Sequence, residues 1–236
     1  MLPAPLALLV TLGVAYGWMK ANEAAAQRGW LTPQVSRKII HTGTGPLYVL
    51  TWLLYPDDRA VRLYAMLVPL ALTVRVAAVG LGLWRDPATV QAMSRSGQRH
   101  ELLRGPLLYG LVFVALTVAY GRTSPPAVAA LMMLCGGDGL ADLVGRRWGH
   151  AKLPWNRQKS WAGSAAFWLG GWALTALVAA VYTAAGVWPG PWSGYLAPAA
   201  AVALAAAAVE SLPWREVDNL VVPLVALAVA HLVPWP

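Results

Sequence analysis

Charged side chains are scarce in this sequence, since only 12% of its 236 residues are Asp, Glu, Lys or Arg. An average soluble domain carries about 25% of such residues. Hydrophobic residues make up 58% of the chain, and the mean hydropathy is +0.53. These values exclude an ordinary soluble domain and predict an integral membrane protein.

Acidic residues are the rarer charge, with 10 Asp and Glu against 18 Lys and Arg, which gives a net charge of +8. In a membrane protein such a basic excess usually lies in loops that face anionic lipid headgroups. The charge therefore indicates contact with membrane lipids, and it is no argument for a nucleic-acid partner.

Cysteine and several common catalytic motifs are also lacking. The single cysteine, Cys135, excludes an intramolecular disulfide, and no Cys or His stands at metal-ligand spacing from it. The sequence has no GxxxxGK[ST], no HExxH and no GxSxG. These absences argue against a P-loop enzyme, a zincin and a hydrolase with a nucleophile elbow.

Long apolar runs are present instead, and they predict an all-α, polytopic integral membrane protein with about seven or eight transmembrane helices. We expect a single membrane domain over residues 1–236. The fifth apolar run ends at Leu134, too early to cross a ~30 Å hydrocarbon core, so we expect that helix to continue to Arg146. The expected spans are Leu2–Met19, Ile39–Tyr55, Ala60–Trp84, Pro106–Tyr120, Pro126–Arg146, Trp161–Ala185, Pro198–Val209 and Leu220–Val233.

Lys and Arg alternate strongly between the loops, with fourteen in one set and three in the other. The positive-inside rule puts the basic loops in the cytoplasm and both termini outside. We therefore expect a bacterial-type inner or cell membrane, with the active site on the cytoplasmic side.

The stretch 135–164 concentrates polar residues between apolar helices. Asp138 and Asp142 are spaced i,i+4 and so share one face of a helix, where they could hold Mg²⁺ together with substrate phosphates. Gly137 and Gly139 beside them allow a backbone or ligand to approach closely. The alternative is structural ion pairing, for which Arg146 stands four residues after Asp142.

Hydrogen-bond donors follow the two aspartates, and they suit a phosphate group. Ser160 is a candidate N-cap for the next helix, and a helix N-terminus next to a lysine forms an anion site. The alternative is a solvated basic loop that rests on lipid headgroups. The candidate nucleotide-binding residues of this segment are Lys152, Asn156, Lys159, Ser160 and Gly163.

A second cluster, Arg37, Lys38 and His41, lies on one flank of the second expected span. These side chains could bind phosphate or transfer a proton, or they could anchor the helix at the membrane surface. Arg104 belongs to a similar basic cluster, for which an anchoring role is the more natural interpretation.

Glu210 and Asp218 flank the last basic loop. Carboxylates at the ends of apolar helices are costly unless they are paired or bind metal, so both are candidate metal ligands. Pairing with Arg215, or with Arg75 inside the third span, is the alternative.

Several blocks of the chain resemble the phytol kinase and dolichol kinase family, which includes polyprenol and diacylglycerol kinases and is related to the phosphatidate cytidylyltransferases. The similarity is greatest to the phytol and farnesol kinase branch. The central block is GDGLADLVGRRWG followed by KLPWNRQKSWAGS, and the further blocks are RKIIHTGTG, RGPLLY, ESLP and DNLVVPL.

The resemblance implies a multi-span membrane enzyme that phosphorylates a lipid alcohol, typically with CTP as donor. It implies nucleotide and metal binding in the central block, at Asp138, Asp142, Lys152, Lys159 and Ser160. It implies supporting roles for Arg37, Lys38, His41, Glu210, Asp218 and Asn219.

Residues and resemblance together suggest a kinase that moves a phosphoryl group from CTP, or another nucleoside triphosphate, to an isoprenoid alcohol such as phytol, farnesol or geranylgeraniol. The expected cofactor is Mg²⁺, and the expected partners are the nucleotide, the lipid alcohol and membrane lipids. Catalysis would fall to Asp138, Asp142, Lys159 and His41.

Three alternatives stay open. A cytidylyltransferase acting on phosphatidate or an isoprenoid phosphate needs the same groups but releases pyrophosphate. A transporter would use Arg75, Asp138 and Glu210 as an ion path. A degenerate relative would bind lipid without catalysis.

Overall fold

The computed structural model describes residues 1–56, 58–94, 96–214 and 217–236, and within these it leaves out the side chains of Glu23, Pro33, Gln34 and Arg37. The described chain is mostly helical with very little sheet, which confirms the predicted all-α class. The helices are α1 Ala4–Gln27, α2 Pro33–Thr51, α3 Arg59–Leu81, α4 Pro87–Met93, α5 Gly105–Ala119, α6 Pro125–Met132, α7 Asp138–Trp148, α8 Trp161–Ala184, α9 Leu196–Glu210 and α10 Asp218–Leu232.

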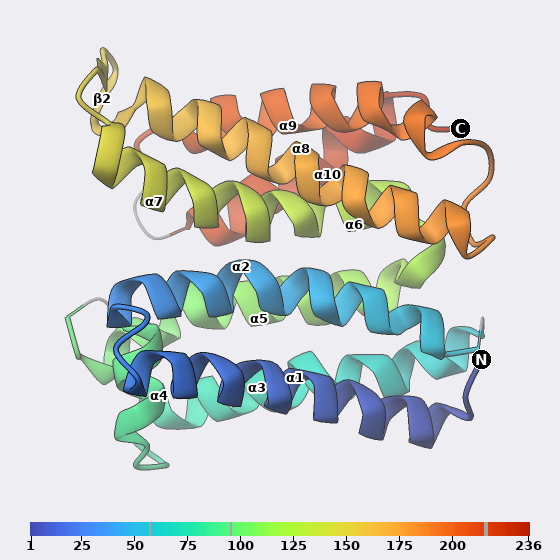
Figure 1. The fold of residues 1–236 in the computed structure, drawn as a ribbon, viewed down its shortest axis with the longest axis horizontal. Coiled ribbons are helices and arrows are strands. Elements are labelled where there is room, and N and C mark those ends of the chain that lie inside the picture. The colour runs from blue at the N-terminus through green and yellow to red at the C-terminus, as the bar shows by residue number, and fades with distance from the viewer. Residues whose placement is uncertain (57, 95, 215–216) are drawn as a thin grey trace.

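The long helices run up and down along one direction in two layers, with α1 to α5 in one layer and α6 to α10 in the other (Figure 1). Both termini lie at one end of the bundle, and the short strand β2 (Asn156–Ser160) lies at the opposite end. The basic loops therefore gather at one end, as the distribution of Lys and Arg predicts. The two layers meet mainly where α2 packs on α7 and where α10 packs on α5.

Six helical stretches of the described chain are long and apolar enough to cross a membrane. Helix α10 is apolar but shorter, and α2 coincides with the second predicted span. Each predicted span therefore overlaps a helix. The largest difference is at the end of α1, which was predicted at Met19 and lies at Gln27. The six stretches are Ala4–Gln27, Arg59–Leu81, Arg99–Ala119, Pro125–Trp148, Trp161–Ala184 and Trp192–Glu210.

The fifth span continues past its glycines, as predicted, but through a turn of π-helix at Met133–Gly137 that joins α6 to α7. Such π-bulges often accompany functional sites. Here the turn precedes Asp138, and Leu131 to Cys135 beside it are at most 1% exposed. This helix is the most buried of the six stretches, with 67% of its apolar window inside the bundle against 11% for α1.

Small residues allow the central helix to approach α8 closely. A methyl group on Gly136 would lie 2.7 Å from Leu174, and one on Gly170 would overlap the carbonyl oxygen of Gly136. Close packing of glycines is a usual way to join helices in a membrane, where apolar side chains gain little by leaving lipid. This close contact fixes the position of α7 along α8, and therefore the position of the polar face of α7.

The basic segment after α7 has regular structure. Strands β1 Lys152–Leu153 and β2 Asn156–Ser160 pair antiparallel as a small hairpin, with Lys152 opposite Ser160. Along β2 the two end residues, Asn156 and Ser160, are buried, and the residues between them are more exposed. Because these strands are short and polar, their sequence carries no clear strand signal.

Candidate active site

Asp138 stands at the start of α7 and contacts two basic residues of α2. Its Oδ2 lies 3.2 Å from Lys38 Nζ and 3.2 Å from His41 Nε2. The Asp138 side chain is 27% exposed and that of Lys38 is 12% exposed, so the pair is largely shielded from solvent. Ionised groups at this depth attract each other more strongly than at an open surface.

Asp142, one turn further along α7, shares the same lysine. Its Oδ2 lies 3.4 Å from Lys38 Nζ, and its Oδ1 accepts a 2.7 Å hydrogen bond from Arg146 Nε. The ion pair with Arg146 predicted as an alternative is therefore present, but Asp142 also faces the shared site. Lys38 holds the two carboxylates on one side of the helix, as their i,i+4 spacing predicts.

Gly139 allows α2 to come close enough for these contacts. A methyl group at this position would overlap Thr42 Oγ1, one residue beyond His41 on α2. A methyl group on Gly137 would similarly lie 2.6 Å from Phe167 of α8. Both glycines thus serve helix packing around the carboxylates, and their predicted role in phosphate binding stays a prediction.

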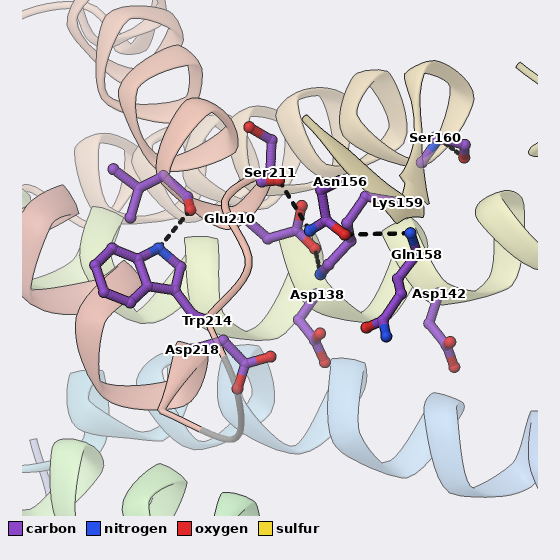
Figure 2. A network of polar contacts seen from close by, with 12 residues as sticks. Asp138, Asp142, Asn156, Gln158, Lys159, Ser160, Glu210, Ser211, Trp214 and Asp218 are labelled. Carbon is purple, nitrogen blue, oxygen red and sulfur yellow. Dashed lines mark hydrogen bonds and ion pairs between the residues drawn. The ribbon is translucent and has the colours of Figure 1, made fainter. Parts of the chain in front are cut away.

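The hairpin is tied to the turn after α9 by three side chains. Lys159 forms an ion pair with Glu210, whose side chain is only 4% exposed. Asn156 Nδ2 donates a 3.1 Å hydrogen bond to the Ser211 carbonyl, and Trp155 Nε1 donates one of 3.1 Å to Ser211 Oγ. Figure 2 shows the contacts of Lys159 and Asn156 beside Asp138. The hairpin therefore cannot shift without breaking a buried ion pair.

Ser160 ends the hairpin and caps α8, as predicted. Its Oγ accepts a 3.1 Å hydrogen bond from the Gly163 backbone N–H, and the serine is 3% exposed. The backbone of Gly163 lies against the Ala141 carbonyl of α7. Lys152, also predicted to bind phosphate, lies exposed on β1 at the outer side of the hairpin.

Asp218 begins α10 and faces the site from the other side (Figure 2). Its neighbour Asn219 donates a 3.0 Å hydrogen bond from Nδ2 to the Gly105 carbonyl at the start of α5. This bond joins the first turn of α10 to the residue that follows Arg104. Arg104 is exposed and lies on the rim of the cavity described next.

A cavity of about 320 Å³ opens beside these groups. Lys38, His41, Asp138 and Asp218 line its polar end, and its walls are apolar side chains of α1, α2, α3 and α5. The sequence alone does not reveal this cavity, because its walls come from helices far apart in the chain.

Tyr109 is a further residue that the sequence analysis did not single out. Its hydroxyl donates a 3.2 Å hydrogen bond to the His41 carbonyl, and its ring centroid lies 4.7 Å from that of His41. Tyr109 therefore positions the histidine. The sequence feature that could have indicated Tyr109 is the RGPLLY block, which ends at this tyrosine.

Arg75 does not join the central charges, contrary to two of the sequence-based alternatives. It forms an ion pair with Asp86, with Nε 3.0 Å from Oδ2, in the loop between α3 and α4. The ion path through Arg75, Asp138 and Glu210 is therefore not formed. The side chain of Arg37 and all of Arg215 lie outside the described residues.

Within the part of the chain that the structure describes, no three His, Cys, Asp or Glu side chains gather as a ready metal cluster. Glu210 is paired with Lys159, while Asp138 and Asp142 share Lys38. The two aspartates still match the usual protein share of a Mg²⁺ site, which is one or two carboxylates completed by substrate phosphates and water.

Comparison with known proteins gives relatives along nearly the whole chain. The wheat (Triticum aestivum) protein named "Probable phytol kinase, chloroplastic" is 40% identical over 227 residues, which is 95% of this chain and 75% of the relative. "Phytol kinase 1, chloroplastic" of Arabidopsis thaliana is 35% identical over 228 residues, or 96% of this chain and 75% of that protein. No family model and no solved structure matches the chain.

These relatives overturn the predicted location. Their names place those proteins in chloroplasts, which contradicts the predicted bacterial-type inner membrane with a cytoplasmic active site. The predicted resemblance is confirmed by identity that extends over about 95% of the chain. From its relatives and its matching blocks, the chain belongs to the phytol kinase family.

Proposed function

We propose that this protein is a membrane kinase that transfers the γ-phosphoryl group of a nucleoside triphosphate to the hydroxyl of an isoprenoid alcohol. The preferred donor in this proposal is CTP. One observation carries the proposal. A carboxylate, Asp138, lies with a lysine and a histidine at the polar end of an apolar cavity. A lipid alcohol needs such a combination, with a hydrophobic wall for its tail and charged groups for the phosphoryl transfer.

The reaction follows from this arrangement. The alcohol oxygen attacks the γ-phosphorus, the bond from phosphorus to the bridging oxygen breaks, and the nucleoside diphosphate leaves with the electron pair. The hydroxyl proton passes to Asp138, whose Oδ2 lies 3.2 Å from His41 Nε2. A loose transition state needs little help from a base, so positioning and charge matter more than the basicity of this carboxylate.

Mg²⁺ is part of the proposal, with Asp138 and Asp142 as its protein ligands. When bound, the ion would neutralise charge on the β- and γ-phosphate oxygens. Lys38 Nζ lies within 3.4 Å of both carboxylates and balances their negative charge. In the proposed complex its ammonium group also lies near the phosphates. Glu210 and Asp218, also predicted as ligands, border the same space.

Lys159 is the proposed partner of the phosphate chain on the hairpin side. Its ion pair with the buried Glu210 fixes the ammonium group beside Asp138 (Figure 2). A fixed cation stabilises the charge that develops on the leaving oxygen without a cost of reorganisation. Asn156 and Ser160 hold the hairpin in shape through their own hydrogen bonds, and Lys152 and Gly163 complete the proposed nucleotide side.

A single assay tests the proposal. Purified protein in detergent receives Mg²⁺, a γ-labelled nucleotide and one alcohol from a panel of phytol, geranylgeraniol, farnesol and a long polyprenol, and the lipid phase is then extracted. We expect label in the lipid phase, with CTP the best of CTP, UTP, GTP and ATP. Release of pyrophosphate with phosphatidate or a prenyl phosphate would instead establish a cytidylyltransferase. Absence of both products would contradict the proposal.

A further inference from the structure

The cavity beside Asp138 reaches far into the layer of α1 to α5. On α2 it is lined from Lys38 and His41 at the polar end to Tyr48 and Thr51 at the deep end. From His41 to Thr51 is ten residues of helix, or about 15 Å at 1.5 Å per residue. One lipid tail contributes about that length to a ~30 Å hydrocarbon core.

The deep end of the cavity is closed by side chains that are held in place. The Tyr48 hydroxyl bonds to the Ala65 carbonyl at 2.9 Å and to Thr117 Oγ1 at 3.1 Å. Thr11 Oγ1 lies 3.1 Å from the Tyr55 hydroxyl on the α1 side. Because their polar groups are satisfied, these residues form a fixed floor with no need of a ligand atom there.

The polar end has the opposite character. Trp18 of α1 lines the cavity, and its buried Nε1–H has no hydrogen-bond partner among the described residues. Buried donors without partners are costly, and they indicate that an acceptor belongs there. An alcohol oxygen is such an acceptor.

We infer that this cavity holds the hydrocarbon tail of the acceptor alcohol, and that its floor at Tyr48 and Thr51 sets the length of tail the enzyme accepts. The inference rests on the proposed kinase function. The tail enters from the polar end with its hydroxyl beside His41 and Asp138, and it lies among Val68, Phe113 and the apolar residues of α1. An alcohol of phytol length fills the depth, whereas the tail of a long polyprenol exceeds it.

Two substitutions narrow the cavity, and one neighbour serves as control. Val68→Phe adds bulk near the floor, where Val68 is 4% exposed and lines the cavity. Ala15→Phe adds bulk from α1, which is packed more loosely. Leu67→Phe makes a similar change on the adjacent residue, which is 41% exposed on the outer face of α3 and does not line this cavity.

The first readout is the ratio of kcat/KM for phytol to kcat/KM for geraniol, which has a similar head and a much shorter tail. We expect Val68→Phe and Ala15→Phe to lower this ratio about tenfold, and Leu67→Phe to leave it within about twofold of wild type. Unchanged ratios in both cavity variants of an active enzyme would overturn the inference and leave the kinase function standing.

The second readout needs no turnover. Wild-type protein is irradiated with a phytol analogue that carries a diazirine at the end of its tail, with and without excess phytol. We expect adducts on peptides of α2, α3 and α5 that excess phytol suppresses. Adducts confined to outward residues such as Leu67, or insensitive to phytol, would overturn the inference. Suppressible adducts in the cavity of a protein that phosphorylates no alcohol would instead contradict the proposed function alone.

Discussion

The two layers of the bundle differ in how completely they are packed. Residues 127–135 of the central helix are at most 1% exposed, and glycines bring α7 and α8 into backbone contact. The other layer contains a cavity of about 320 Å³, and its outermost helix, α1, is only 11% buried over its apolar window. The well-packed layer supplies most of the charged groups of the site, and the layer with the cavity supplies most of its apolar wall.

This difference suits a kinase that acts on a lipid. Phosphoryl transfer depends on groups held in place before the reaction, and the packed layer fixes Asp138, Asp142 and the pair Lys159–Glu210. A lipid tail needs an apolar space that it can enter from the membrane, and a layer with unfilled volume offers it. Lys38 and His41 of α2 connect the two layers, because they line the cavity of one layer and contact Asp138 of the other.

The largest effect is expected from Asp138→Asn, which removes charge from the packed layer. The amide keeps the shape of the side chain but no longer balances Lys38 or accepts the hydroxyl proton. We expect kcat to fall roughly a hundredfold to a thousandfold. The measurement is transfer of label from nucleotide to phytol, with circular dichroism to show that the helices persist.

Asp86→Asn is the matched control for that experiment. Asp86 is an equally paired carboxylate, but it lies in the loop between α3 and α4 and contacts Arg75 and Thr89. We expect phytol phosphorylation within about twofold of wild type in this variant. Near wild-type activity in Asp138→Asn, or equal losses in both variants, would remove Asp138 from the reaction.

The next effect concerns stability and tests the difference in packing directly. In Gly170→Ala the new methyl group meets the Gly136 backbone, which cannot move aside as a side chain can. We expect a loss of about 1–3 kcal/mol, as is typical of overpacking. The control is Gly17→Ala on α1, where nothing lies within 4 Å of the added atom.

Thermal unfolding in detergent without ligands gives both values. Alanine favours helix over glycine by up to about 1 kcal/mol, so Gly17→Ala is expected to be neutral or slightly stabilising. Equal losses from Gly170→Ala and Gly17→Ala would show that the two layers do not differ in packing.

Much of the fold was predictable because a membrane helix carries a strong signal. Leu2–Met19 and Trp161–Ala185 are long and largely apolar, and both overlap observed helices, although α1 continues to Gln27. The continuation of the fifth span through Gly137 was also predictable, because Pro126–Leu134 alone is too short to cross. The π-helical turn within it was not, because it depends on packing against α8.

The candidate site was predictable residue by residue but not as an arrangement. Asp138 and Lys38 both stood out, because ionisable groups are expensive at membrane depth. Their ion pair joins residues 100 positions apart, and nothing in the local sequence specifies it. The sequence suggested that Gly139 leaves room for a ligand. In the structure it leaves room for α2, because Thr42 of α2 packs against it, and the sequence alone does not show this contact.

A smaller loss of activity is expected from Glu210→Gln, which tests whether the packed layer holds the hairpin for catalysis. The variant keeps a hydrogen-bond acceptor but leaves the Lys159 ammonium without its buried counter-charge. We expect kcat to fall about tenfold, because a cation that is no longer fixed stabilises the leaving oxygen less well.

The control for Glu210→Gln is Asp58→Asn at the other end of the bundle, where Asp58 accepts a hydrogen bond from the Ala60 backbone. That variant should leave kcat unchanged. Glu210→Gln has a positioning effect if kcat falls while the KM for phytol stays the same. A rise in the KM for phytol with unchanged kcat would contradict that role.

The smallest effect is expected from Asp86→Asn and concerns stability. Asp86 lies outside the membrane spans, in the layer with the cavity. Hydrogen bonds from Thr89 and the guanidinium of Arg75 lower the pKa of Asp86 from 3.8 to about 2. A carboxyl whose folded pKa lies below its unfolded value adds stability above the unfolded pKa and loses it as pH falls through the folded pKa. At pH 6 we expect the free energy of unfolding of wild type to exceed that of Asp86→Asn by up to about 1 kcal/mol. The difference is small because exposed ion pairs contribute little to stability. The difference in unfolding temperature should then shrink between pH 4 and pH 2 by these pKa values. A difference that stays constant over that range would show that Asp86 acts through packing and the cap of α4, with no part played by its charge.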